Sequence, residues 1–179
     1  MISTQNLKDY NTIRLAGVVR ESIVDGPGLR FTVFCQGCPH GCEGCHNPAT
    51  HDFEGGYDCE ISKIIAAVDE NPLLDGVTFS GGEPMCQPEA FTVLAEELKK
   101  RNLNIMIYTG YTYEELLKLA ETRPAVGKLL ELADYLVDGR FILAQRDLTL
   151  PFRGSTNQRI LDMKQTLAAG KPVFAEKYL

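Results

Sequence analysis

Four cysteines lie within eleven residues, at Cys35, Cys38, Cys42 and Cys45. Thiols this close together are poorly placed to pair with one another as disulfides, and they are typical ligands of a soft metal centre. The inner spacing, Cys-x3-Cys-x2-Cys, supplies three ligands, whereas a cubane iron–sulfur cluster holds four irons. If only these three cysteines bind, one iron stays open for a substrate, and the centre is a site of reaction rather than a store of electrons.

Cys35 leaves two other interpretations open. With it, the run reads as two Cys-x2-Cys pairs, but structural zinc sites separate such pairs by about a dozen residues or more, and only three residues lie between them here. A bacterial ferredoxin run has the order x2, x2, x3, whereas the order here is x2, x3, x2. The spacing favours an iron–sulfur site on three cysteines, and a centre on all four is the alternative.

A second motif follows the cysteines. Residues 76–80 have the pattern of a short buried strand, and Gly81, Gly82, Glu83 and Pro84 come directly after it. Two glycines at a strand end allow the backbone to approach a ligand closely, and their peptide groups with the Glu83 carboxylate would suit an amino group. A lone Gly-Gly pair more often marks a plain turn, but its place after the cysteine loop indicates a shared site.

Together these residues resemble the radical S-adenosylmethionine superfamily. The matching residues are Cys38, Cys42, Cys45 and the turn 81–83. The resemblance implies a [4Fe-4S] cluster on the three cysteines, with its open iron chelated by the amino and carboxylate groups of S-adenosyl-L-methionine. It also implies an α/β fold, a partial (β/α) barrel with a parallel sheet and outer helices.

Further segments resemble one branch of the superfamily, the activases of glycyl radical enzymes: residues 24–30 and 46–47. Later segments are similar to the activases that act on anaerobic ribonucleotide reductase: residues 108–111 with 114–116, 136–141 and 152–159. The similarity extends from about residue 17 to residue 162.

The resemblance implies a specific reaction. A reduced cluster gives one electron to S-adenosylmethionine, the bond from sulfur to C5′ breaks, and the 5′-deoxyadenosyl radical takes a hydrogen atom from a glycine of a partner protein. The implied partner is the glycyl radical subunit of anaerobic ribonucleotide reductase, and the electron donor would be a protein such as a reduced flavodoxin. Pyruvate formate-lyase or a small molecule is the alternative substrate. A non-enzymatic electron carrier or zinc module is the alternative of another class, but it leaves the turn 81–83 without a purpose.

The resemblance also suggests roles for five other residues. Arg140 becomes a candidate for the carboxylate of S-adenosylmethionine, which a guanidinium holds in a fork, and Asp138 for ordering polar ligands at the same edge. Asp25, with Gly26 and Gly28, would contact the glycine-bearing loop of the partner. The plainer interpretations are a surface ion pair for Arg140 and an ordinary turn before the cysteine loop.

The remaining cysteines and histidines carry weaker signals. Cys59 and Cys86 stand alone in the sequence, and free cysteines are usually small buried apolar residues. We expect His40 and His51 to be ordinary loop residues, and His46 to lie near the cluster without binding it, because iron–sulfur sites prefer thiolates.

Composition is that of a soluble protein. The chain has 179 residues and a net charge of −6, which argues against nucleic acid or an anionic membrane as a partner. It has no apolar run of about 20 residues that could span a bilayer, and its first residues lack the layout of a secretory signal. Six cysteines at these spacings then indicate a reducing cytoplasm, and we expect one domain over residues 1–179.

Strand and helix patterns alternate along the chain. Strands are predicted at 15–19, 31–34, 76–80, 104–108 and 135–138, and helices at 61–68, 88–101, 113–120 and 125–133. Such alternation predicts a parallel sheet with right-handed crossovers, whose carboxyl edge would carry the cysteine loop, 81–83, 109–110 and 138–140. The last part is ambiguous, with a possible strand at 159–161, a helix at 163–169 and a strand at 172–174.

Overall fold

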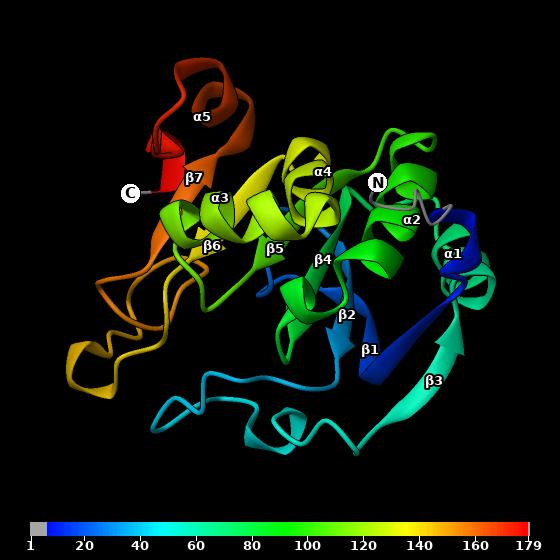
Figure 1. Ribbon diagram of the computed structural model, residues 1–179, viewed down its shortest axis with the longest axis horizontal. Coiled ribbons are helices and arrows are strands. Elements are labelled where there is room, and N and C mark those ends of the chain that lie inside the picture. The colour runs from blue at the N-terminus through cyan, green and yellow to red at the C-terminus, as the bar shows by residue number, and fades with distance from the viewer. Residues whose placement is uncertain (1–6, 179) are drawn as a thin grey trace.

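The computed structural model describes residues 7–178, whose strands form one seven-stranded sheet in the order β3-β1-β2-β4-β5-β6-β7 (Figure 1). The strands are β1 (Thr12–Ser22), β2 (Arg30–Cys35), β3 (Tyr57–Glu60), β4 (Gly76–Gly81), β5 (Asn104–Tyr108), β6 (Tyr135–Asp138) and β7 (Arg159–Asp162). The helices are α1 (Ile61–Asp69), α2 (Pro88–Lys99), α3 (Tyr113–Thr122), α4 (Pro124–Leu132) and α5 (Met163–Ala169).

The centre of the sheet is parallel and its edges are antiparallel. β2, β4, β5 and β6 run in the same direction, with helices in the crossovers, whereas β1 and β3 on one side and β7 on the other pair antiparallel. The expected α/β class, with a parallel sheet and outer helices, is confirmed. The parallel part of the sheet is limited to β2, β4, β5 and β6, and the outer strands β3 and β7 do not pair with each other, so the sheet does not close.

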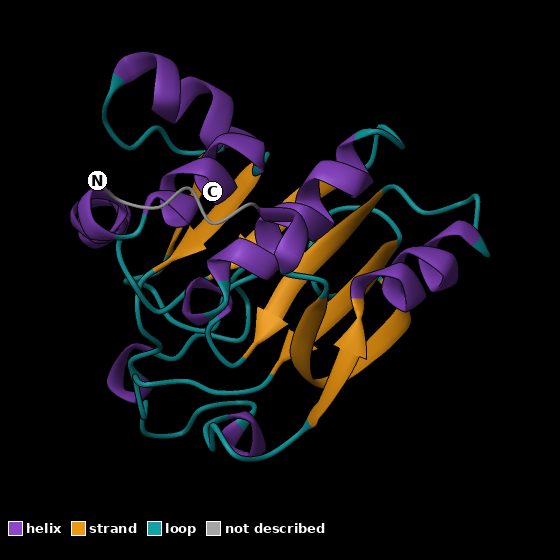
Figure 2. Cartoon of the chain, turned by 45° about the vertical axis from the view of Figure 1, so that its right-hand side comes forward, coloured by secondary structure: helices purple, strands orange, loops and turns teal. Residues whose placement is uncertain are grey.

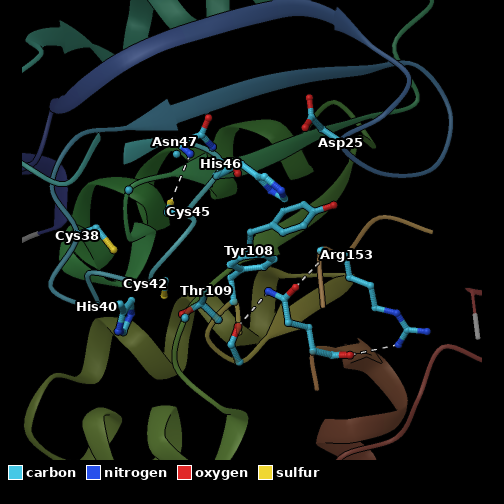
Figure 3. A pocket seen from close by; sticks show the side chains of 18 of the residues that line it. Asp25, Cys38, His40, Cys42, Cys45, His46, Asn47, Tyr108, Thr109 and Arg153 are labelled. Carbon is cyan, nitrogen blue, oxygen red and sulfur yellow. Dashed lines mark hydrogen bonds between the residues drawn. The ribbon is translucent and has the colours of Figure 1, made fainter. Parts of the chain in front are cut away.

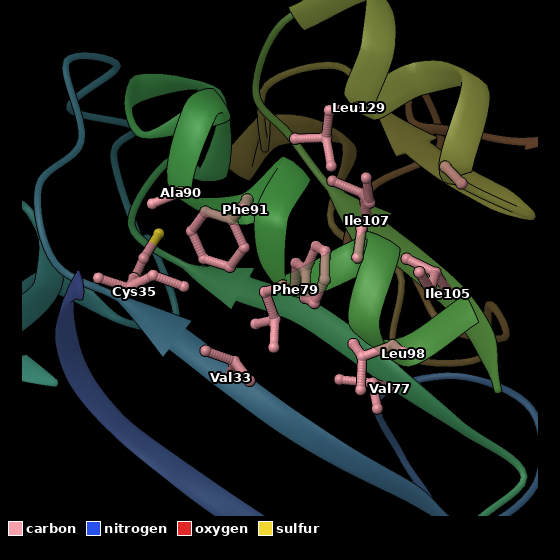
Figure 4. Packing of buried hydrophobic residues seen from close by; sticks show 14 of the residues in the cluster. Val33, Cys35, Val77, Phe79, Ala90, Phe91, Leu98, Ile105, Ile107 and Leu129 are labelled. Carbon is pink, nitrogen blue, oxygen red and sulfur yellow. The ribbon is translucent and has the colours of Figure 1, made fainter. Parts of the chain in front are cut away.

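Side chains alternate between the two faces of each strand, and one face packs against the helices (Figure 2). On this helix-side face, the core holds Val33 and Cys35 of β2, Phe79 of β4 and Ile107 of β5, all fully buried. Figure 4 shows these residues meeting Phe91 and Leu98 of α2 and Leu129 of α4. Burial of this continuous apolar layer is the main force that holds the helices on the sheet.

The opposite face is smaller and more polar. Its apolar part is a separate cluster of Met106, Val137, Ile160 and Ala175, the last of which belongs to the C-terminal segment. Next to this cluster the Arg30 side chain is fully buried, and its burial lowers the pKa of the guanidinium. This cavity-side face, which also carries the polar residues of β2 and β4, leads to the carboxyl edge of the parallel strands.

Local sequence explains most element boundaries. Proline begins α2 and α4, where its missing N–H costs nothing, and Thr112 and Glu115 form a capping box at the start of α3. Asp162 caps α5, and Gly170 ends it in the left-handed conformation with φ +66°. The predictions at 104–108, 135–138 and 163–169 therefore match the structure.

The structure differs from the predicted elements at β1, at β3 and near the C-terminus. β1 is longer than the predicted strand at 15–19. Its pairing with β2 has two irregularities of the β-bulge type, and the strand continues beyond both of them. β3 was not predicted, since its side chains are mostly exposed and show no apolar alternation. The segment 172–174 contributes only an isolated bridge between Leu161 and Phe174. Within residues 7–178, the structure has no helix long and apolar enough to cross a membrane.

Candidate functional site

A cavity of about 690 Å³ opens at the carboxyl edge of the parallel strands (Figure 3). Its walls come from the cysteine loop after β2, the turn after β4, the ends of β5 and β6, and the segment before β7. Its size suits a small-molecule ligand. The sequence predicted that these four strand ends would meet at one edge, and the structure brings all of them together.

The cysteine loop is closed at its base by main-chain hydrogen bonds. Gly37 N donates to Thr50 O at 2.8 Å, and Cys38 N donates to His51 O at 3.2 Å. From this closed base, Cys38, Cys42 and Cys45 all line the cavity. The loop thus presents three thiols to one space, as the Cys-x3-Cys-x2-Cys spacing predicted.

Cys35 lies on the other side of the sheet. It is fully buried in the helix-side core, and this burial raises the pKa of its thiol well above the usual range. It does not line the cavity, so its position fits a centre that uses three cysteines rather than four.

The three thiols match the ligand set of a cubane cluster. In such a cluster each cysteine binds a different iron, so three cysteines leave one iron open. Cys38, Cys42 and Cys45 line one cavity, while the fourth cysteine of the run is buried in the core. This arrangement fits a [4Fe-4S] cluster with one open iron.

The turn after β4 packs directly on the start of the cysteine loop. Gly82 N donates to Cys35 O and Glu83 N to Gly37 O, both at 2.8 Å. A Cβ atom at Gly82 would lie 2.3 Å from Gly37 O, and one at Gly81, with φ +92°, would lie 2.6 Å from Cys35 N. Both glycines line the cavity, but the close approach that requires them is to this chain's own backbone. The contact of these glycines with a ligand stays a prediction.

Glu83 does not line the cavity with the glycines. Its carboxylate is fully buried, and each oxygen accepts two hydrogen bonds. The donors are Met85 N and the Thr109 hydroxyl on Oε1, and Gly110 N and His40 Nε2 on Oε2. The predicted contact between this carboxylate and an amino group of the cofactor would have to displace one of these donors.

Arg140 and Asp138 are placed differently from each other. Arg140 is exposed beside a smaller adjoining hollow and forms an ion pair with Glu115 at 3.4 Å, as its plainer interpretation held. Asp138 is fully buried and accepts hydrogen bonds from Tyr113 N and from the Arg159 guanidinium. The Glu114 carboxylate also forms an ion pair with Arg159. Asp138 and Glu114 together raise the pKa of the Arg159 guanidinium. Neither Arg140 nor Asp138 lines the main cavity, so a contact of either with the cofactor remains a prediction.

Asp25 lines the cavity, whereas Gly26 and Gly28 lie behind it. The Asp25 carboxylate accepts hydrogen bonds from the Ser22 and Thr32 hydroxyls at 2.6 and 3.2 Å. Gly26 and Gly28 have φ of +137° and +75°, values that glycine adopts most easily. The two glycines therefore shape the turn that carries Asp25, and they make no direct wall of the cavity.

Sequence reasoning missed the residue that holds this turn. The Arg30 guanidinium donates to the Thr78 hydroxyl at 2.7 Å and to Pro27 O at 3.1 Å, and Thr78 in turn donates to Asp25 O at 2.7 Å. The Arg30 guanidinium also donates to Val77 O and to Asn104. A buried arginine with all of these acceptors fixes the turn in place. One signal for it is present in the sequence, which is that Arg30 ends the segment 24–30 that resembles the activases.

The far wall of the cavity comes from the segment before β7. Figure 3 shows Cys38 and Cys42 on one side of Tyr108, and Asp25 and Arg153 on the other. The Tyr108 hydroxyl donates to Phe152 O at 2.7 Å, and burial raises the pKa of this phenol. Arg153 donates to Gln158 O at 3.2 Å, and its buried Nε has no hydrogen-bond partner among the described residues.

Comparison with known proteins agrees with this geometry. Residues 24–161, which include all the residues that line the cavity, match the family model "4Fe-4S single cluster domain". The anaerobic ribonucleoside-triphosphate reductase-activating protein of Vibrio cholerae is 39% identical over 146 residues, covering 77% of this chain and 90% of the relative. This chain belongs to that family of activating proteins.

Other relatives place the family among activating enzymes. The protein of the same name from Escherichia coli K12 is 34% identical over 146 residues, covering 76% of this chain and 90% of that protein. A pyruvate formate-lyase-activating enzyme from Clostridium pasteurianum is 38% identical over 114 residues, covering 59% of this chain and 48% of that enzyme. The reductase-activating proteins thus match over a longer part of the chain.

Proposed function

We propose that this protein activates anaerobic ribonucleoside-triphosphate reductase by generating a glycyl radical on it, with a [4Fe-4S] cluster and S-adenosyl-L-methionine as cofactors. One observation carries the proposal. Cys38, Cys42 and Cys45 share a cavity with the turn at Gly81 and Gly82, while Cys35 is buried on the opposite face of the sheet. The site therefore offers three thiols to a cluster and leaves room beside it for a small molecule.

When bound, the cluster and S-adenosylmethionine supply a one-electron reductive cleavage that yields a radical able to take a hydrogen atom from a glycine Cα. The three thiols would hold the cluster, and the peptide groups of Gly81 and Gly82 would border the methionine end of the cofactor. The protein's own part is to orient these groups and keep water and reactive hydrogens away.

The wall of the cavity suits that task. Phe34, Phe141, Leu150 and Phe152 give it an apolar lining next to the polar strand ends. The Tyr108 hydroxyl donates to the Phe152 carbonyl oxygen, and burial raises the pKa of this phenol. The apolar side chains exclude water from the site, and the incoming glycine would be the preferred target because its Cα–H bond is weak.

The partner would enter at the end of the cavity away from the cysteines. There the Asp25 carboxylate can accept from main-chain N–H groups of a glycine loop, and the partly exposed Arg153 guanidinium can donate to its carbonyl oxygens. Gly26 and Gly28 shape the turn behind Asp25. The electron would come from a one-electron protein donor such as a reduced flavodoxin, in the cytoplasm.

The test is electron paramagnetic resonance on an anaerobic mixture of the reconstituted protein, dithionite, S-adenosylmethionine and the candidate partner. With anaerobic ribonucleotide reductase we expect a glycyl doublet, together with 5′-deoxyadenosine and methionine. A doublet with pyruvate formate-lyase and none with the reductase would replace the proposed partner. Absence of a radical with either protein would contradict the activase function.

A further inference from the structure

His40 lies inside the cysteine loop, between Cys38 and Cys42, yet its side chain is directed away from solvent. Its Nε2 donates to Glu83 Oε2 at 2.7 Å, and both side chains are almost completely buried, at 5% and 0% exposure. The ring also packs edge-on against Tyr111, with 4.5 Å between the ring centroids. His40 does lie in a loop, as expected, but its buried side chain distinguishes it from an ordinary loop residue.

Glu83 joins His40 to two other parts of the site. The same carboxylate binds Met85 N at the turn after β4, and it binds the Thr109 hydroxyl and Gly110 N at the end of β5. Among residues 7–178, the contact with His40 is the one hydrogen bond between two side chains that ties residues 38–45 to another part of the chain. Without it, the middle of the loop would be held mainly by its closed base.

The space around the imidazole is closely fitted. A Cβ atom at Gly110 would lie 2.3 Å from the His40 ring, so the end of β5 leaves room only for glycine. Tyr111, Gly110 and Glu83, each from outside the cysteine loop, surround much of the ring, and the residue also lines the main cavity. Such enclosure fixes one position for the histidine and, through the main chain, for the two cysteines beside it.

We propose that His40 is a positioning residue that fixes the cysteine loop to the turn after β4 through Glu83. It thereby sets where the three thiols stand relative to Gly81 and Gly82, the part of the cavity assigned to the small cofactor. The proposal rests on the proposed function for the identity of that cofactor. The anchoring of the loop itself is a property of the protein without cofactors and can be measured separately.

The experiment compares His40→Leu with His40→Gln. Leucine retains apolar volume but cannot donate, whereas the glutamine amide reproduces a donor at a similar reach. In the metal-free protein, hydrogen–deuterium exchange of residues 38–45 should be about 10-fold faster or more in His40→Leu, because a hydrogen bond to a buried carboxylate is lost. His40→Gln should stay within about 3-fold of the unaltered protein, since most of that bond is restored.

After anaerobic reconstitution, both variants are examined by electron paramagnetic resonance of the reduced cluster, with and without S-adenosylmethionine. In His40→Leu the cofactor-induced change in the spectrum should be lost or weakened, and His40→Gln should restore it. His46→Leu is the matched control for exchange, because His46 lies in the same loop and packs on Phe141 without a hydrogen bond to Glu83. It should leave exchange at 38–42 unchanged.

Unchanged exchange and an unchanged cofactor response in His40→Leu would overturn the proposal. So would equal loss in His40→Gln and His40→Leu, since it would show that the donor does not matter. If His40→Leu does not fold, Glu83→Gln gives the same test from the other partner, because an amide nitrogen facing His40 or Gly110 disrupts the same set of bonds. If the unaltered protein gives no response to S-adenosylmethionine while the exchange result holds, the proposed function fails and the anchoring role stands.

Discussion

The two faces of the sheet differ most clearly at the end of β2. Cys35 turns into the helix-side core, and Cys38, three residues later, lines the cavity on the opposite side. On the helix side, burial is apolar and continuous, as with Phe79 against Phe91 at 4.7 Å between ring centroids. Away from that core, the buried groups include the Arg30 guanidinium and the carboxylates of Glu83 and Asp138. One face supplies stability, and the other holds polar groups in place for chemistry.

Two buried charged groups on the cavity side are stabilised by hydrogen bonds to partners far away in the sequence. Arg30 bonds to residues on β4 and β5, and Glu83 bonds to the cysteine loop and to the end of β5. An unpaired buried charge would cost several kcal/mol, so these contacts are required for folding as well as for function. Substitutions in the helix-side core should therefore change stability alone, whereas substitutions of these polar groups should change both stability and activity.

The largest expected effect separates the cysteines of the two faces. Serine in place of Cys38, Cys42 or Cys45 should abolish cluster binding and cleavage of S-adenosylmethionine, because each removes a thiolate ligand of the cluster. Iron content, visible absorbance and 5′-deoxyadenosine formation measure the outcome. Cys35→Ala, in the helix-side core, should retain the cluster and lose only stability. Loss of the cluster in Cys35→Ala, with retention in one of the other three, would reverse the ligand assignment.

The next effect is on folding stability. Arg30→Met should lower the free energy of unfolding by about 3 kcal/mol, because the acceptors at Thr78, Val77 and Asn104 lose their buried donor. Ile107→Val in the helix-side core is the comparison, with an expected loss of about 1 kcal/mol. Urea denaturation of the metal-free variants measures both. If Arg30→Met is no more destabilising than Ile107→Val, the hydrogen bonds of Arg30 that fix the turn carrying Asp25 contribute little.

A smaller effect is expected from one methyl group at the turn after β4. Gly82→Ala places a Cβ atom 2.3 Å from Gly37 O, and the required shift should cost about 2 kcal/mol and reduce the iron content after reconstitution. Gly17→Ala is the matched control, because nothing lies within 4 Å of its Cβ position. Full cluster content and unaltered stability in Gly82→Ala would show that the turn can move away from the cysteine loop.

Sequence alone predicted the helix-side face far better than the cavity side. The strands at 104–108 and 135–138 follow from local apolar patterns, and so does the inward face of α2. Spacing and resemblance also found the three cysteines and the glycine turn. Neither could show that Glu83 binds His40 or that Arg30 reaches Asn104, since these partners are 43 and 74 residues apart in the chain. The resemblance made Arg140 a candidate for the cofactor, but it could not show that Arg140 pairs with Glu115 or that Arg153 lines the cavity.

The smallest effect concerns the reactivity of thiols in the metal-free protein. The reactive form is the thiolate, so a raised pKa slows alkylation at neutral pH. Burial raises the pKa of Cys35 well above its usual range and that of Cys86 to about 11. Iodoacetamide at pH 8, followed by mass spectrometry, should therefore label Cys35 last, after the partly exposed cysteines that line the cavity.

The pH dependence of Cys86 completes this prediction. Below a pKa of about 11, each unit of pH raises the thiolate fraction about tenfold, so its labelling should accelerate from pH 8 to pH 10 by about 100-fold. Cys35 should stay unlabelled over the same range as long as the protein is folded, because the helices close over it as well. Rapid labelling of Cys35 at pH 8 would mean that the helix-side core opens readily. The thiols of the two faces would then differ little in accessibility.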